Sequence, residues 1–127
     1  MTPAQKIKQR ILLDFVDEGS LSIDPAAITA DNVDELYEEQ DAYDLEYEFR
    51  QGEVETGIPC EYSRHYESRS VAAQMADGSW VGWTYWSGGG KHGEPESIPW
   101  MSEAYELDVK EEEKLVIVQT FSKKGKE

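Results

Sequence analysis

Carboxylates are the side chains of this sequence whose number and spacing suit a chemical role. Residues 31–55 contain eleven of them and a single cation, Arg50, so this stretch alone contributes −10 to the net charge of −15. Such concentrated negative charge costs folding stability through self-repulsion, which favours an explanation through a binding partner. The carboxylates are Asp31, Asp34, Glu35, Glu38, Glu39, Asp41, Asp44, Glu46, Glu48, Glu53 and Glu55.

We predict that seven of these carboxylates bind a partner. Three of them fall in residues 43–50, which alternate as a strand does, so they would stand on one face about 6.7 Å apart. Rows of carboxylates imitate nucleic-acid phosphates, so the expected partner is a basic protein surface. In a narrower form of this hypothesis, the protein is an inhibitor that mimics the charge of a nucleic acid. A face that only confers solubility and a weak cation site stay open as alternatives. The seven residues are Asp34, Glu35, Glu38, Glu39, Asp44, Glu46 and Glu48.

The tryptophans suggest a different site. All four lie between residues 80 and 100, on both sides of a Gly/Pro-rich loop over 88–98. Aromatic faces beside a flexible loop can form a pocket for a planar or extended ligand, whereas the competing explanation is that these rings fill a small core. The alternative function is therefore a small-ligand or peptide-binding module. Its residues would be Trp83, Tyr85, Trp86, Lys91, His92 and Trp100.

Motifs for catalysis, metals and nucleotides are weak. The glycine-rich loop lacks the spacing of a phosphate-binding loop. His92 with Glu94 and Glu96, or with His65 and Cys60, lacks the spacing of a zinc site. Cys60 and His65 would lie on opposite faces of a strand, too far apart to act as nucleophile and base. We expect no cofactor or metal and, on balance, no enzymatic activity; a hydrolase that uses Glu94 or Glu96 is the third hypothesis.

Composition narrows the class of partner and compartment. A pI near 4.4 argues against direct binding to nucleic acid or to an anionic membrane, because both require a basic surface. The single cysteine excludes an internal disulfide and fits a reducing compartment. No apolar run reaches the length of a membrane span, so we expect a cytoplasmic protein. A homodimer through the Trp-rich strand stays open.

Helix signals and strand signals occupy different parts of the chain, which predicts an α+β fold in a single domain over 1–127. Two N-terminal helices would pack on one antiparallel sheet of about five strands. The first helix begins with a capping box at Thr2 and Gln5 and ends near Gly19. The helices are expected over 3–18 and 31–41, the strands over 43–50, 60–76, 79–87, 103–109 and 114–122, and a basic tail over 123–127.

A hairpin is the sharpest structural prediction. Asp77-Gly78 between two apolar segments is typical of a two-residue type I′ turn, which fixes the register of the two strands. In that register Met75 faces Trp80 and Val71 faces Thr84. Both faces of the second strand carry aromatic residues, so either the strand is central or one face forms a ligand surface.

Overall fold

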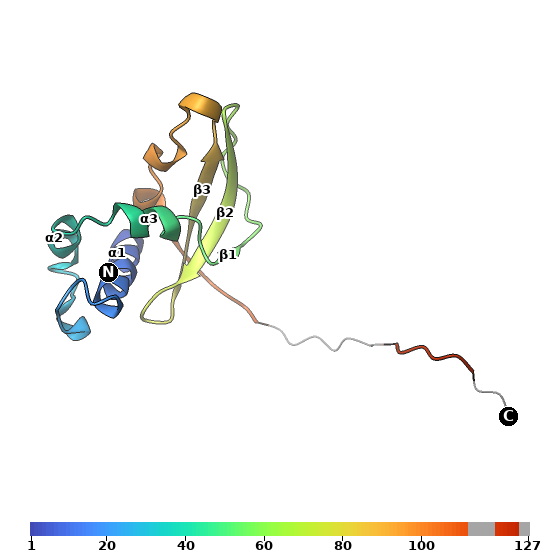
Figure 1. The fold of residues 1–127 in the computed structure, drawn as a ribbon, viewed down its shortest axis with the longest axis horizontal. Helices are drawn as coiled ribbons and strands as arrows, with labels where there is room; N and C mark the ends of the chain where they lie inside the picture. The colour runs from blue at the N-terminus through green and yellow to red at the C-terminus, as the bar shows by residue number, and fades with distance from the viewer. Residues whose placement is uncertain (112–118, 125–127) are drawn as a thin grey trace.

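The computed structural model describes residues 1–111 and 119–124, apart from the side chain of His92. These residues form an α+β fold with one antiparallel sheet of four strands in the order β1-β2-β3-β4. Figure 1 shows the three α-helices grouped on one side of the long β2–β3 hairpin. The strands are β1 (Val54–Glu55), β2 (Tyr66–Gln74), β3 (Trp80–Gly88) and β4 (Tyr105–Leu107).

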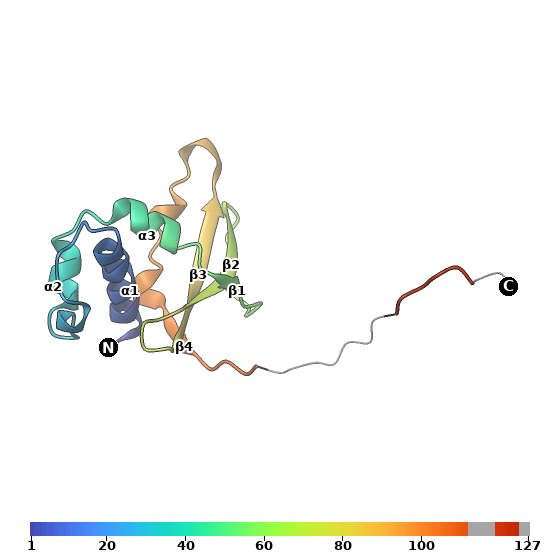
Figure 2. The ribbon, with the colours of Figure 1, turned by 60° about the horizontal axis from the view of Figure 1, so that its bottom comes forward.

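The helices differ in length and position. The α-helices are α1 (Pro3–Asp17), α2 (Val33–Glu38) and α3 (Tyr43–Phe49). Short 3-10 turns connect the remaining elements: η1 (Pro25–Ala27), η2 (Gly90–His92), η3 (Pro95–Ser97) and η4 (Met101–Glu103). Figure 2 shows α3 lying between α1 and the upper part of the hairpin. Helix α1 contacts α2, α3 and β3, so it joins the other two helices to the sheet.

Helix α1 confirms the first predicted helix and supplies the centre of the core. The Thr2 hydroxyl accepts from the backbone of Gln5, whose side chain accepts from the backbone of Thr2, as in a capping box. Ile7 and Ile11, four residues apart and fully buried, pack with strand residues in one cluster. Leu12 belongs to a second buried cluster, in which it packs with Ile28 and with Val33 of α2.

The predicted strand over 43–50 is wrong, because these residues form helix α3. The alternation of Tyr43, Leu45, Tyr47 and Phe49 also contains two pairs spaced four residues apart, and such pairs share a face of a helix. Leu45 and Phe49 pack on the core, whereas the exposed fractions of Tyr43 and Tyr47 are 60% and 41%. An alternation of four apolar residues is thus too short to distinguish the two-residue repeat of a strand from the 3.6-residue repeat of a helix.

The hairpin occurs where it was predicted, but the register is wrong by one residue. Val71 pairs with Trp83, not Thr84, and Gln74 pairs with Trp80. A type I′ turn requires positive φ at both central residues. Among the described residues only glycines have positive φ, with Gly78 at +86°, so Asp77 does not fit that turn. The loop instead has three residues, and the Met75 amide donates to the carbonyl of Ser79 at 2.7 Å.

The other predicted strands are matched to different degrees. The strand over 60–76 is shortened to β2, and the strand over 103–109 is shortened to β4. Strand β1 was not predicted. Most of the strand predicted over 114–122 lies outside the described residues, and residues 119–122 have no regular secondary structure.

Candidate functional site

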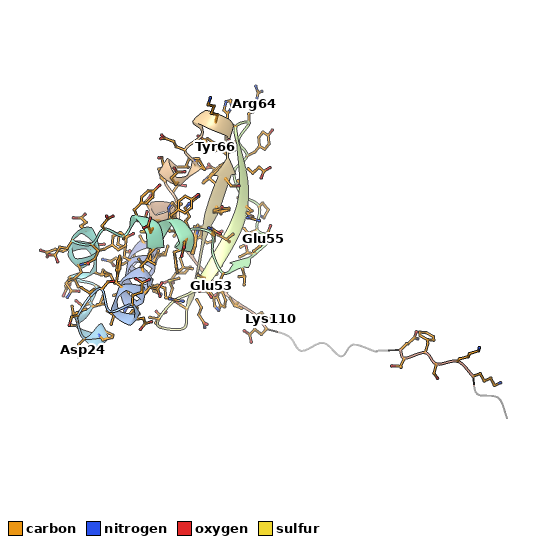
Figure 3. All side chains as sticks on the ribbon, viewed as in Figure 1. Asp24, Glu53, Glu55, Arg64, Tyr66 and Lys110 are labelled. Atoms are coloured by element: carbon orange, nitrogen blue, oxygen red, sulfur yellow. The ribbon has the colours of Figure 1, made fainter. Side chains whose placement is uncertain are left out.

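Helices α2 and α3 carry the densest charge of the molecule. Residues 31–48 contain nine carboxylates and no lysine or arginine. All except Glu46 are exposed, and Figure 3 shows side chains of α2 projecting away from the sheet. We call this group the acidic surface; it comprises Asp31, Asp34, Glu35, Glu38, Glu39, Asp41, Asp44, Glu46 and Glu48.

Two residues of the acidic surface are engaged within the protein. Asp34 accepts from Lys8 Nζ at 2.8 Å and from Gln5 Nε2 at 3.2 Å, and these bonds lower the pKa of Asp34 below its usual range. Glu46 accepts a hydrogen bond from the hydroxyl of Tyr37. Burial, together with that bond, raises the pKa of Tyr37 well above its ordinary value. Both carboxylates therefore help to join the helices.

The other five predicted partner-binding carboxylates are free of ion pairs within the part of the chain that the structure describes. The even row expected on a strand is replaced by a helical arrangement. Asp44 and Glu48 lie one turn apart, about 6 Å along α3, whereas Glu46 is rotated about 200° from Asp44. The five are Glu35, Glu38, Glu39, Asp44 and Glu48.

Exposed tyrosines accompany these carboxylates. The rings of Tyr43 and Tyr47 stack with centroids 6.2 Å apart. The guanidinium of Arg50 lies 4.6 Å from the Tyr47 ring centroid and 5.0 Å from that of Tyr85. Arg69 stacks on Tyr85 in turn, at 5.0 Å. This series of contacts leads from the sheet to Tyr43 of α3, which is largely exposed.

Arg50 anchors α3 to the sheet. Its Nη1 donates to the Trp86 carbonyl at 2.8 Å, and its own carbonyl accepts from Trp83 Nε1 at 2.7 Å. The sequence pattern did not mark Arg50, Tyr43 or Tyr47 as residues of a binding site. The available signal was a lone cation beside aromatic residues in an otherwise acidic stretch, which is unusual enough to indicate cation–π stacking.

The tryptophans of the alternative site lie mainly in the core. Trp83 is fully buried against Phe49 and Trp100, with ring centroids 5.6 and 5.3 Å away. Trp86 and Trp100 are also buried, whereas Lys91 in η2 is exposed. The remaining two residues of that site are Tyr85, which is half-buried, and His92, whose side chain lies outside the described part.

The candidate metal and catalytic residues are dispersed. Cys60 is half-buried with its Sγ 3.6 Å from the Ser68 hydroxyl, and His65 is exposed. Within the described residues, no three His, Cys, Asp or Glu side chains are grouped as metal ligands would be. Glu94 is exposed at the N-cap of η3, and Glu96 is half-buried within η3.

Comparison with known proteins does not assign this site. No family model, no curated protein and no solved structure matches the chain. Among the described residues, no helix has the length and apolar character needed to cross a membrane.

Proposed function

We propose that the protein is a non-enzymatic interaction protein that binds a basic macromolecular surface through the acidic surface of α2 and α3. The observation that carries this proposal is the composition of that surface. It presents nine carboxylates without a cation among residues 31–48, and it adds the exposed rings of Tyr43 and Tyr47.

The chemistry of the surface suits lysine and arginine side chains. Clustered carboxylates attract a basic partner over a Debye length and accelerate association. Exposed tyrosines contribute apolar contact area and cation–π attraction, and tyrosine is enriched among residues that dominate binding energy. The expected partner is therefore a protein with a basic surface, and a nucleic-acid-binding protein is the class that most often has one.

The version in which the protein inhibits by mimicking nucleic-acid charge now has less support. It was predicted from an even row of carboxylates on a strand, and α3 is a helix. The ligand-binding module predicted from the Trp-rich strand is also less supported, because Trp83, Trp86 and Trp100 are used in packing.

A charge-matched pair of variants tests the proposed function. The surface variant carries Glu35→Gln, Glu38→Gln, Glu39→Gln, Asp44→Asn and Glu48→Gln. The control variant removes five exposed acids outside α2 and α3, with Asp17→Asn, Glu18→Gln, Glu61→Gln, Glu67→Gln and Glu103→Gln. Each set of five substitutions changes the net charge from −15 to −10, so only the location of the charge differs.

The probe is a nona-arginine peptide, and its dissociation constant is measured by calorimetry. We expect affinity to fall about tenfold or more between about 50 and 500 mM salt. At the lower salt concentration the surface variant should bind at least about tenfold more weakly than the control variant. Equal affinities for the two variants would show that net charge, and not the acidic surface, governs binding.

A further inference from the structure

The sheet has an outer face, opposite the helices. Val71 in β2 and Val81 in β3 belong to the core cluster that contains residues of α1. Side chains alternate between the two faces of a strand, so Ala72 and Trp80 lie on the other face. Figure 1 shows the three α-helices on one side of the hairpin, and the outer face is the side that points away from them.

An apolar groove lies on this outer face. Its volume is about 320 Å³, at the lower end of the roughly 300–1,000 Å³ that ligand pockets occupy. Three of its side chains are open to solvent: the exposed fractions of Val54, Ile58 and Val109 are 47%, 40% and 51%. All four strands and the segments that follow β1 and β4 contribute to it. Its apolar residues are Val54, Ile58, Ala72, Trp80, Leu107 and Val109.

The gathering of these side chains indicates a binding surface. Single apolar residues at a protein surface need no explanation, whereas a contiguous apolar surface with a polar rim marks an interaction site. In this groove the polar residues Thr56, Asp108 and Lys110 complete the lining. We therefore expect the groove to receive an apolar side chain.

The C-terminal segment of the chain carries such a side chain. Residues 119–124 are all exposed and have no regular secondary structure, and Figures 1 and 2 both show them well apart from the sheet and the helices. The exposed fraction of Phe121 is 85%, so its ring has little contact with its own chain. Residues 119–126 also contain three lysines and none of the 27 acidic residues of the protein. The segment thus combines an apolar anchor with positive charge.

Charge and chain length both favour a second copy as the source of that anchor. With a net charge of −15, two copies repel each other over most of their surfaces, and residues 119–126 are a part that approaches without repulsion. Phe121 is twelve residues beyond Val109, and an extended chain of that length spans about 40 Å. This reach permits two copies to exchange their segments reciprocally, which closes the assembly at a dimer.

We propose that the groove binds Phe121 of a second copy, so that two copies exchange their C-terminal segments in a symmetric dimer. The phenyl ring packs against the exposed side chains of Val54, Ile58 and Val109. This inference goes beyond the proposed function, because it concerns a second copy of the chain and the sheet face that points away from α2 and α3. The contact is small and the two copies are both acidic, so the dimer is weak and reversible.

The test measures self-association of the full chain by sedimentation equilibrium between about 10 and 1,000 µM, the range in which small transient interfaces associate. Salt at about 500 mM screens the repulsion between copies, and we expect a monomer–dimer equilibrium. Phe121→Ala should weaken dimerisation by about tenfold or more, because each dimer loses two buried rings. Tyr62→Ala should leave dimerisation unchanged. Tyr62 is a matched control, since its exposed fraction is 88% and it lies outside the groove.

A mixture of two variants identifies the contact. The groove variant carries Ile58→Ser and Val109→Ser, two exposed positions at which the fold should tolerate substitution, and far-UV circular dichroism checks this. It retains Phe121, whereas Phe121→Ala retains the groove, and each alone should dimerise at least about tenfold more weakly than the unmodified chain. Mixed together, they should form a heterodimer through one intact contact, detected by sedimentation of one chain that is labelled at its N-terminus.

Three results would overturn the proposal. They are a chain that stays monomeric over the whole concentration range, a Phe121→Ala variant that dimerises as strongly as Tyr62→Ala, and a mixture that gains no heterodimer. A monomer in which Phe121→Ala alters the fluorescence of Trp80 would show that the segment covers its own groove, which also overturns exchange between copies. None of these outcomes bears on the nona-arginine titration, which probes α2 and α3.

Discussion

The β2–β3 hairpin and helix α3 both carry aromatic residues, but they use them in opposite ways. Trp83 in the hairpin is 0% exposed and contacts Phe49 and Trp100, whereas Tyr43 on α3 is 60% exposed and stacks on Tyr47. The hairpin also carries little net charge compared with the acidic surface. Trp83 and Trp86 of the hairpin thus serve the core, whereas the surface available to a basic partner lies on α2 and α3.

The largest expected effect on the free energy of unfolding comes from the buried hairpin residue Trp83. Trp83→Ala should lower the free energy of unfolding by about 3–5 kcal/mol, because it leaves a cavity and removes the donor to the Arg50 carbonyl. Tyr43→Ala should change it by no more than about 0.5 kcal/mol. Urea unfolding followed by far-UV circular dichroism measures both. A similar loss in the two variants would abolish the distinction between the regions.

Gly52, at the junction of α3 and β1, tests how tightly the two regions are joined. Its φ is +75°, and a Cβ there would lie 2.6 Å from Val71 Cβ. Gly57 has the same φ but open space around it, which makes it a matched control. Gly52→Ala should cost about 2 kcal/mol or more and Gly57→Ala about 1 kcal/mol, measured by urea unfolding. Equal costs would mean that the junction is loose.

The pH dependence of stability should also separate the regions. In the hairpin turn, bonds from Ser79, with help from Lys6, lower the pKa of Asp77 from 3.8 to about 2. The folded state thus holds the ionised form, and the resulting stability is present above about pH 4 and is lost as pH falls toward 2. Asp77→Asn should reduce the fall in Tm between about pH 4 and pH 2, measured by thermal unfolding. An unchanged fall in Tm would contradict this.

The loss of stability at alkaline pH should come from the helices. The pKa of Tyr37 is raised above its ordinary value of 10, by burial and by its bond to Glu46. Stability from the protonated hydroxyl is therefore complete below pH 10 and declines as pH rises above it. Tyr37→Phe should reduce that decline without affecting the fall in Tm at acid pH. Thermal unfolding between pH 8 and about 11 measures it.

The smallest effects concern single carboxylates of the acidic surface. Glu39 caps the C-terminus of α2, where the helix dipole disfavours negative charge, whereas Glu35 lies in the first turn. Glu39→Gln should stabilise the protein by about 0.3 kcal/mol and Glu35→Gln should not, and the difference should shrink in high salt. Chemical unfolding at two salt concentrations measures the difference. Equal effects would indicate that only overall self-repulsion matters.

The sequence predicted local structure better than long-range contacts. The capping box of Thr2 and Gln5 is a local signal, and α1 was placed within a residue of its observed bounds. The hairpin was located by Asp77-Gly78, but its register depended on the backbone of Asp77, which sequence does not show. Helix α3 was mistaken for a strand because its two tyrosines are exposed and so do not mark a buried face.

The role of Arg50 could not be predicted from its neighbours along the chain. Its stacking partner Tyr85 and its acceptor Trp86 lie more than thirty residues away and come together only through the hairpin register. The predicted carboxylates, by contrast, are all exposed except Glu46, although their segment is a helix and not the expected strand, because charged side chains remain at the surface in either case.

The most direct test of the central claim is affinity capture from the cells that naturally make this protein. The surface variant and the control variant, which have equal net charge, are immobilised beside the unmodified protein at about 50 mM salt. We predict that a basic protein is retained by the unmodified protein and by the control variant, released at about 500 mM salt, and absent from the surface variant. Retention of the same basic proteins by both variants would contradict the assignment of binding to α2 and α3.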